Sequence, residues 1–115
     1  MNTRLAETTI CGEFHINSAN ITEVLTLWSA SSTLKVHGTV SIFNHKQSNS
    51  SVFLNIIHNE GTCSLPVLPG NTCAFSCAGM HHIEVEIEKS LNNTASGTFG
   101  IDIYYQVLNE EEDEE

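Results

Sequence analysis

The sequence predicts an all-β fold: a single-domain, eight-stranded antiparallel β-sandwich of the jelly-roll type. The first observation is a strict alternation of apolar and polar residues over Thr98–Val107, which places every second side chain on one face of a strand. The second is a turn cluster about every ten residues along the chain. The third is that no segment shows a helical period. Eight short antiparallel strands commonly form a two-sheet sandwich, of which the jelly roll is one form.

The N-terminal part of the chain predicts an arm followed by two strands. Residues 1–10 are mostly polar with weak patterning, and we expect a flexible arm or connector there. Gly12–Asn17 predicts a short strand, because Phe14 and Ile16 alternate with polar residues. Thr22–Trp28 carries apolar residues on both faces. That pattern suits an inner strand, or a strand covered by a neighbouring subunit.

The middle of the chain predicts three more strands. Thr33–Phe43 is long and apolar on one face, and its Gly38 indicates a bulge or a bend. Val52–His58 follows a polar loop. In the short strand Cys63–Leu68, Pro66 predicts an edge position, because proline has no backbone N–H to donate to a ladder.

The last three strands complete the eight. They are Thr72–Cys77, His81–Lys89 and the closing strand Thr98–Val107, which we expect to be central and to lie beside the first strand. A jelly-roll domain over residues 11–108 therefore follows the arm, and residues 109–115 form a disordered acidic tail. A length of 115 residues with 40% hydrophobic content suits one domain with one core.

The charge pattern excludes some functions. The chain has 4 basic and 14 acidic residues, and its last six residues are all acidic. Such a block is either a solvated, solubilising tail or an interaction tail. The few basic residues are scattered, so nucleic-acid binding is disfavoured. No apolar run is long enough for a membrane span, and the N-terminus lacks the pattern of a cleavable secretion signal.

The four cysteines are Cys11, Cys63, Cys73 and Cys77. On a strand, Cys73 and Cys77 would lie roughly 13 Å apart, too far for a shared zinc ion or a mutual disulfide. Either Cys63, Cys73 and Cys77 are buried thiols near Phe75, or Cys63 forms an intrasubunit disulfide with one of the other two. Cys11 is either an inert, partly buried thiol or an inter-subunit disulfide cysteine.

Nothing in the sequence predicts an enzyme, a cofactor or a metal site. The chain contains no Gly-x-Ser-x-Gly elbow, no Gly-rich phosphate loop and no His-Glu-x-x-His motif. Glu84, Glu86 and Glu88 share one strand face. A solvated outer face explains these carboxylates better than a calcium or carbohydrate site.

Three stretches resemble the bacterial endospore appendage (Ena) family of spore-surface fibre subunits. They are Ile10–Phe14, which resembles the cysteine-bearing first strand, Ser31–Val36, which resembles a segment leading into a central strand, and Gly97–Tyr105, which resembles the closing strand. The resemblance spans residues 10–108. It implies a jelly roll that self-assembles by sheet augmentation, in which the edge strand of one subunit continues the sheet of its neighbour. It also implies an N-terminal connector whose cysteines bond to neighbouring subunits.

The chain departs from that family pattern at two places. The arm ahead of Cys11 is ten residues long and has no cysteine, and Gly100 stands where family members can carry an acceptor cysteine. The resemblance then implies that Cys11 is a strand-borne acceptor. We expect a structural subunit of an extracellular spore-surface fibre, either helical or built of stacked rings. Its partner is a second copy of itself, with other spore-surface proteins as further partners.

Two alternatives remain open at this point. A ligand-binding jelly roll, lectin-like or of the trimeric tumour-necrosis-factor type, predicts a small closed oligomer with binding groups in its loops. Loops 44–51 and 90–97 offer only Phe43, at a border, as an aromatic platform. A metal-binding redox module on Cys63, Cys73 and Cys77 is disfavoured by the strand spacing given above.

Overall fold

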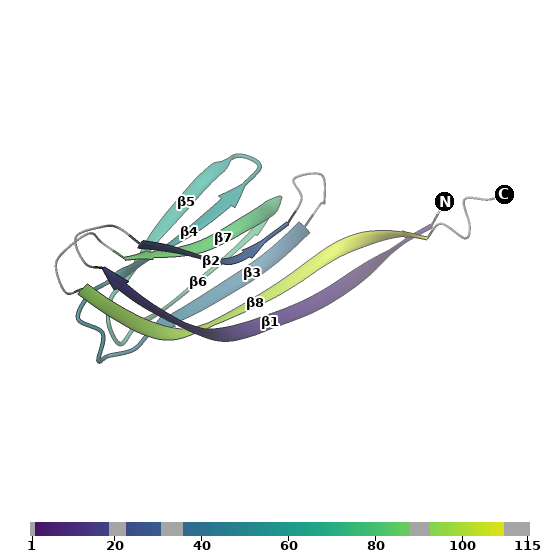
Figure 1. The fold of residues 1–115 in the computed structure, drawn as a ribbon. Helices are drawn as coiled ribbons and strands as arrows, with labels where there is room; N and C mark the ends of the chain where they lie inside the picture. The colour runs from purple at the N-terminus through teal and green to yellow at the C-terminus, as the bar shows by residue number, and fades with distance from the viewer. Residues whose placement is uncertain (1, 19–22, 31–35, 88–92, 110–115) are drawn as a thin grey trace.

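Eight strands and no helix make up the part of the chain that the computed structural model describes, which is residues 2–18, 23–30, 36–87 and 93–109 (Figure 1). The strands are β1 (Asn2–Ser18), β2 (Glu23–Ser29), β3 (Val36–Asn44), β4 (Val52–His58), β5 (Gly61–Val67), β6 (Thr72–Ala78), β7 (Met80–Ile87) and β8 (Asn93–Asn109). They form two antiparallel four-stranded sheets, ordered β1-β8-β3-β6 (sheet A) and β2-β7-β4-β5 (sheet B). The predicted eight-stranded antiparallel sandwich is confirmed.

The core lies between the two sheets and consists of the side chains that alternation turns inward. Along β3 every second residue is buried, and along β7 Ile83, Val85 and Ile87 are completely buried. The remaining fully buried large residues come from both sheets: Ile16, Ile42, Leu54, Ile56, Met80, Ile101, Val36, Val40, Val52 and Val67. A row of Ile and Val fits a pleated, half-buried surface, so the same residues that favour strands also fill the core.

The first strand is much longer than the sequence predicts. Residues 2–10, assigned above to a flexible arm, form the first half of β1 and pair with β8 from Asn2↔Asn109 onward. Weak side-chain patterning does not prevent this pairing, because the ladder hydrogen bonds come from the backbone of an equally long partner strand. The expected acidic tail falls almost entirely on residues 110–115, outside the described residues.

The last strand is also longer. Asn93–Gly97, which the sequence assigns to a turn, already belong to β8 and pair with Phe14–Ser18 of β1. β8 is an inner strand between β1 and β3 and lies beside the first strand, as predicted. The described β3–β8 pairing ends at Val36↔Tyr105, so the far ends of β1 and β8 continue as a two-stranded ribbon (Figure 1).

Three local predictions have different outcomes. Pro66 lies on β5, an edge strand, as predicted. Gly38 was expected to mark a bulge or a bend; β3 keeps its register there, so the bulge is wrong, and a Cβ at this position would lie 3.1 Å from the sulfur of Met80. The register shifts occur instead at Thr26/Trp28 and Ile57/His58. β2 is an edge strand, so the inner-strand alternative for Thr22–Trp28 is wrong.

The connection from β6 to β7 carries the chain from sheet A to sheet B through Gly79. Gly79 has φ +72°, a conformation that side-chain-bearing residues rarely adopt. Its carbonyl accepts a hydrogen bond of 3.1 Å from the backbone N–H of Asn59, in the turn between β4 and β5. Its N–H donates to the carbonyl of Val36 at 2.8 Å. The two sheets are therefore joined by backbone hydrogen bonds at this end of the sandwich.

Candidate assembly surfaces

The sandwich has four edge strands, two on each lateral side. β1 of sheet A and β2 of sheet B contact each other on one side, and β5 and β6 contact each other on the other. Within the described residues, each of these strands pairs on one side only. An edge strand presents unpaired N–H and C=O groups that another strand can use. The edges are therefore the first surfaces to consider for assembly.

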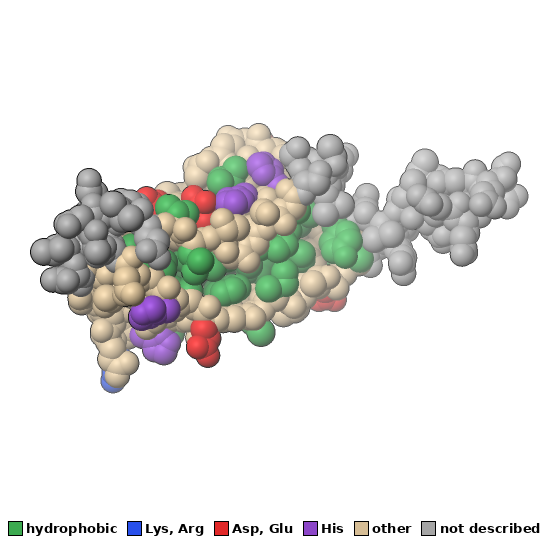
Figure 2. Space-filling view, viewed as in Figure 1, with side chains coloured by type: hydrophobic (Ala, Val, Ile, Leu, Met, Phe, Trp, Pro, Cys, Tyr) green, Lys and Arg blue, Asp and Glu red, His purple; other side chains and the backbone are tan. Residues whose placement is uncertain are grey.

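The β1/β2 side leaves apolar residues uncovered. Leu25 of β2 points toward the inside of the sandwich but is 38% exposed, and Val24 is 47% exposed on the outer face. Leu27 and Trp28 of the same strand are only half-buried against the core. Figure 2 shows hydrophobic side chains gathered along the middle of this face. A core that reaches an edge without being covered fits a site where another strand packs.

The β5/β6 side is also incompletely covered. Cys73, Phe75 and Cys77 of β6 share the inner face and are half-buried against the core. β5 contributes half-buried Leu65, and its exposed Pro66 lacks the N–H that a new ladder would need. On this side, β6 is the edge better able to accept a partner strand.

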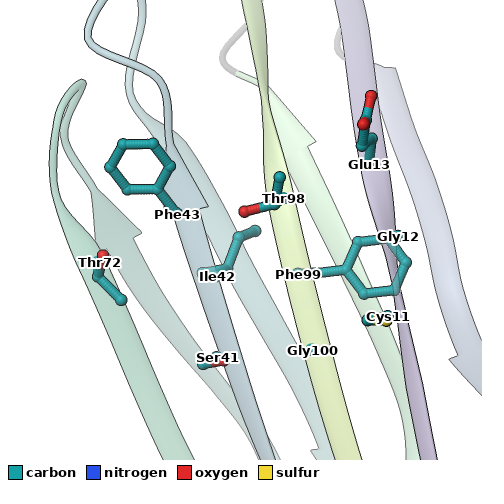
Figure 3. A pocket seen from close by; sticks show the side chains of 10 residues that line it. All are labelled: Cys11, Gly12, Glu13, Ser41, Ile42, Phe43, Thr72, Thr98, Phe99 and Gly100. Carbon is teal, nitrogen blue, oxygen red and sulfur yellow. The ribbon is translucent and has the colours of Figure 1, made fainter.

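The outer face of sheet A carries a hollow of about 510 Å³ beside Cys11 (Figure 3). Cys11 of β1 lies opposite Gly100 of β8, which in turn lies opposite Ser41 of β3. Because Gly100 has no side chain, a Cβ there would meet only Ser41 Oγ, at 3.6 Å. Phe43 and Glu13 stand on the two sides of the hollow.

Cys11 itself is exposed. The expectation of partial burial is therefore wrong for Cys11, and its role as a link between subunits stays a prediction. A thiol on the outer face of an edge strand, next to a position without a side chain, can be approached by another chain. The sequence suggested Cys11 only through its place between arm and strand, whereas the pairing with Gly100 comes from the β1–β8 register.

The other three cysteines lie on the β5/β6 side as free, half-buried thiols. Burial raises the pKa of Cys77, and a negative charge on Cys63 raises it further. Cys77 is therefore predominantly a neutral thiol at pH 7. Cys63 lies on β5 of sheet B and Cys77 on β6 of sheet A, on the same lateral side of the sandwich.

The outer face of sheet B is organised by Asn55, a residue that the sequence reasoning missed. Its Nδ2 donates to Glu86 Oε1 at 2.9 Å and to Glu84 Oε1 at 3.5 Å, and its Oδ1 accepts from Ser64 Oγ at 2.7 Å. His82 Nε2 lies 3.0 Å from Glu84 Oε2. The two carboxylates are half-buried members of this network rather than freely solvated groups. Glu88 lies outside the described residues.

The described residues contain no group of three or more His, Cys, Asp or Glu side chains that could hold a metal ion. In the same residues, no helix is long and apolar enough to cross a membrane. The outer face of sheet A carries two polar contacts between neighbouring strands. Thr9 Oγ1 donates to Asp102 Oδ1 at 2.8 Å, and the hydroxyls of Thr39 and Ser76 lie 2.6 Å apart.

Comparison with solved structures shows the fold. The chain is similar to the endospore appendage protein of Bacillus, described as forming disulfide-linked pili, with a TM-score of 0.73, 9% identity and coverage of 94% of this chain and 93% of that one. It is also similar to the decameric BFDV capsid protein, with a TM-score of 0.55, 9% identity and coverage of 94% and 100%. A third similar structure is the VP2 subviral particle of infectious bursal disease virus, with a TM-score of 0.55 and 15% identity. The match covers 90% of this chain and 33% of that one.

Comparison of sequences shows the family. A search of curated proteins finds no match. The family model for endospore appendages, Enas, matches residues 2–107, nearly the whole chain. That range includes the paired first half of β1, Cys11 and the long closing strand. The chain therefore belongs to the endospore appendage family.

Proposed function

We propose that this chain is a structural subunit of a self-assembling spore-surface fibre, which it builds with further copies of itself by sheet augmentation. The observation that carries the proposal is the uncovered core at both lateral sides, best seen in the 38% exposure of the inward-pointing Leu25. A partner strand that continues a sheet past its edge would supply backbone hydrogen bonds and cover that apolar surface at once.

The four edge strands differ in chemistry, and these differences favour a contact in which β6 of one copy pairs with β2 of the next copy. β5 is disfavoured by Pro66, and β2 carries the most exposed apolar residues of any strand among the described residues. β2 and β6 lie on opposite lateral sides. A contact between two different surfaces is heterologous and repeats head to tail. It produces a helix, or a ring if the rotation closes, and stacked rings would also give a fibre.

A covalent link through Cys11 is a second part of the proposal. Its exposure and the open position at Gly100 give room for an extended segment of another chain to reach the thiol. Residues 1–10 of this chain contain no cysteine. A thiol from a neighbouring chain, either a second copy of this chain or another spore-surface protein, would complete the link.

Negative-stain microscopy of purified protein tests the assembly. The wild-type chain should form filaments or rings, and Leu25→Lys should abolish them, because a charge would be desolvated in the β2 contact. Gln47→Lys is the control, since Gln47 is exposed in the turn between β3 and β4 and lies outside both β2 and β6. Circular dichroism should show the same fold for both variants.

Two outcomes would contradict the proposal. A wild-type chain that is a uniform monomer or trimer would exclude a fibre built by this chain alone. Filaments that persist unchanged in Leu25→Lys would exclude β2 as the augmented edge.

A further inference from the structure

We infer that Cys63 and Cys77 are a disulfide-forming pair that ties the two sheets together across the open β5/β6 side, within one subunit. The two cysteines come from different sheets, Cys63 from sheet B and Cys77 from sheet A. This is a bond inside the subunit, distinct from any link through Cys11, and it does not depend on the proposed assembly.

The geometry of the turn selects this pair. β5 and β6 both extend away from the turn around Gly70 on the same lateral side, one in each sheet and with opposite chain directions, so their inner positions face each other. The inner positions are every second residue, as the burial of both strands shows. Pairs at equal distance from Gly70 are Val67 with Cys73, Leu65 with Phe75, and Cys63 with Cys77. Cys73 therefore faces Val67, and Cys63 faces Cys77.

The distance between the sheets is the next condition. Packed sheets lie about 10 Å apart, whereas a disulfide needs Cα atoms roughly 4.4–6.8 Å apart. Near these cysteines the sheets converge, because the Asn59 N–H donates to the Gly79 carbonyl at 3.1 Å. Cys77 precedes Gly79 by two residues, and Cys63 follows Asn59 by four. The pair therefore lies next to the place where backbone hydrogen bonds join the two sheets.

The chemistry of the two thiols is compatible with oxidation. Both are half-buried, so a small oxidant can reach them. The pKa of Cys77 is raised by burial and by charge on Cys63, so its thiolate is disfavoured. With a low-molecular-weight disulfide as oxidant, the Cys63 thiolate forms a mixed disulfide and releases one small thiol. The Cys77 thiolate then attacks the Cys63 sulfur of the mixed disulfide and releases the second small thiol. One protein disulfide forms, and the oxidant is reduced to two thiols.

Intact mass and peptide mapping test the pair in full-length protein incubated with oxidised glutathione. A Cys11→Ser background prevents links between subunits. The monomer should lose about 2 Da, and mapping should join the peptides that carry Cys63 and Cys77. Cys73→Ser should form the same bond, whereas Cys63→Ser and Cys77→Ser should not.

Thermal unfolding supplies a second readout. Closing a loop of about 15 residues should raise the Tm of the oxidised protein by roughly 10 °C, and dithiothreitol should reverse the shift. Cys77→Ala is a second variant in case the serine variant folds poorly. Three outcomes would overturn the inference: a disulfide that includes Cys73, a disulfide that links two subunits, or unchanged reactivity of all three thiols. Filament formation by the Cys63→Ser variant is measured separately, so failure here is distinguishable from failure of the proposed fibre.

Discussion

At the scale of single residues, two glycines on β8 have opposite roles. Gly97 is buried where β8 passes between β1 and β3, and a Cβ there would overlap the carbonyl oxygen of Phe43 and lie 2.8 Å from the ring of Phe14. Gly100, three residues on, faces open space beside Ser41. The sequence assigns Gly97 to a turn and Gly100 to the outer face of the closing strand, and only the neighbouring strands show what a side chain would meet at each position.

Gly97→Ala should therefore destabilise the protein by about 1–3 kcal/mol or more, because the new methyl group forces the backbone of β3 or the Phe14 ring to move. Gly100→Ala is the matched control on the same strand and should change stability by less than about 0.5 kcal/mol. Urea unfolding of the two variants measures the difference. Equal stability of the two would contradict the packing described at Gly97.

Asn44 shows a similar limit of sequence reasoning. It begins a polar loop in the sequence, yet it is completely buried, and its Nδ2 donates to the carbonyls of Ser50 and Val67 at 3.1 and 3.0 Å. Asn55 likewise reads as a polar interruption of an apolar strand but orders two carboxylates. In both cases the hydrogen-bond partners are brought together by strand pairing and turn geometry, which local patterning does not encode.

At the scale of elements, the long β1–β8 ribbon changes what a truncation at the N-terminus does. The described β3–β8 pairing ends at Tyr105, whose partner on β1 is Ala6. Within the described part of the chain, residues 2–5 pair with the end of β8, whereas Ile10 packs against the core. The first ten residues have two roles, an outer ribbon and an inner part of the sandwich.

Deleting residues 1–5 should leave the Tm within a few degrees of the full chain, because the lost pairs involve only the ribbon. Deleting residues 1–10 should cost about 2 kcal/mol or more, since it removes Ile10 and uncovers the edge of β8. Calorimetry of the two truncations checks the contrast. A large loss of stability on removing residues 1–5 would show that the ribbon supports the core.

At the scale of the whole molecule, the four edges give the sandwich two different lateral sides. One is apolar and lies along β2, and the other lies along β6, next to a proline-bearing β5. Different sides favour head-to-tail repetition over a closed two-fold dimer.

Appendages isolated from spores that carry the Cys11→Ser variant should lose resistance to boiling in detergent, because the proposed covalent link is absent. The subunit fold should be unchanged, since the Cys11 side chain is exposed. Cys73→Ser is the control, as that thiol faces inward. Electron microscopy after heating counts the surviving fibres. Equal resistance in wild type and Cys11→Ser would exclude Cys11 as a link between subunits.

The all-β class, the number of strands and the edge position of Pro66 were all predictable from the sequence. Period-two alternation and turn residues are local signals, so they can be recognised without knowing which strands lie alongside. The sequence also singled out Cys11 as a candidate link between subunits, because a cysteine is recognisable without any knowledge of its neighbours.

The three-dimensional arrangement was needed to show that residues 2–10 belong to a strand, that β2 is an edge, and that Cys63 and Cys77 lie on the same lateral side. Each of these depends on which backbone lies alongside, and sheet pairing joins residues far apart in the chain, such as Asn2 with Asn109. Edges and facing positions are properties of the assembled sheets, because they are set by hydrogen-bond register and by where the chain crosses between layers.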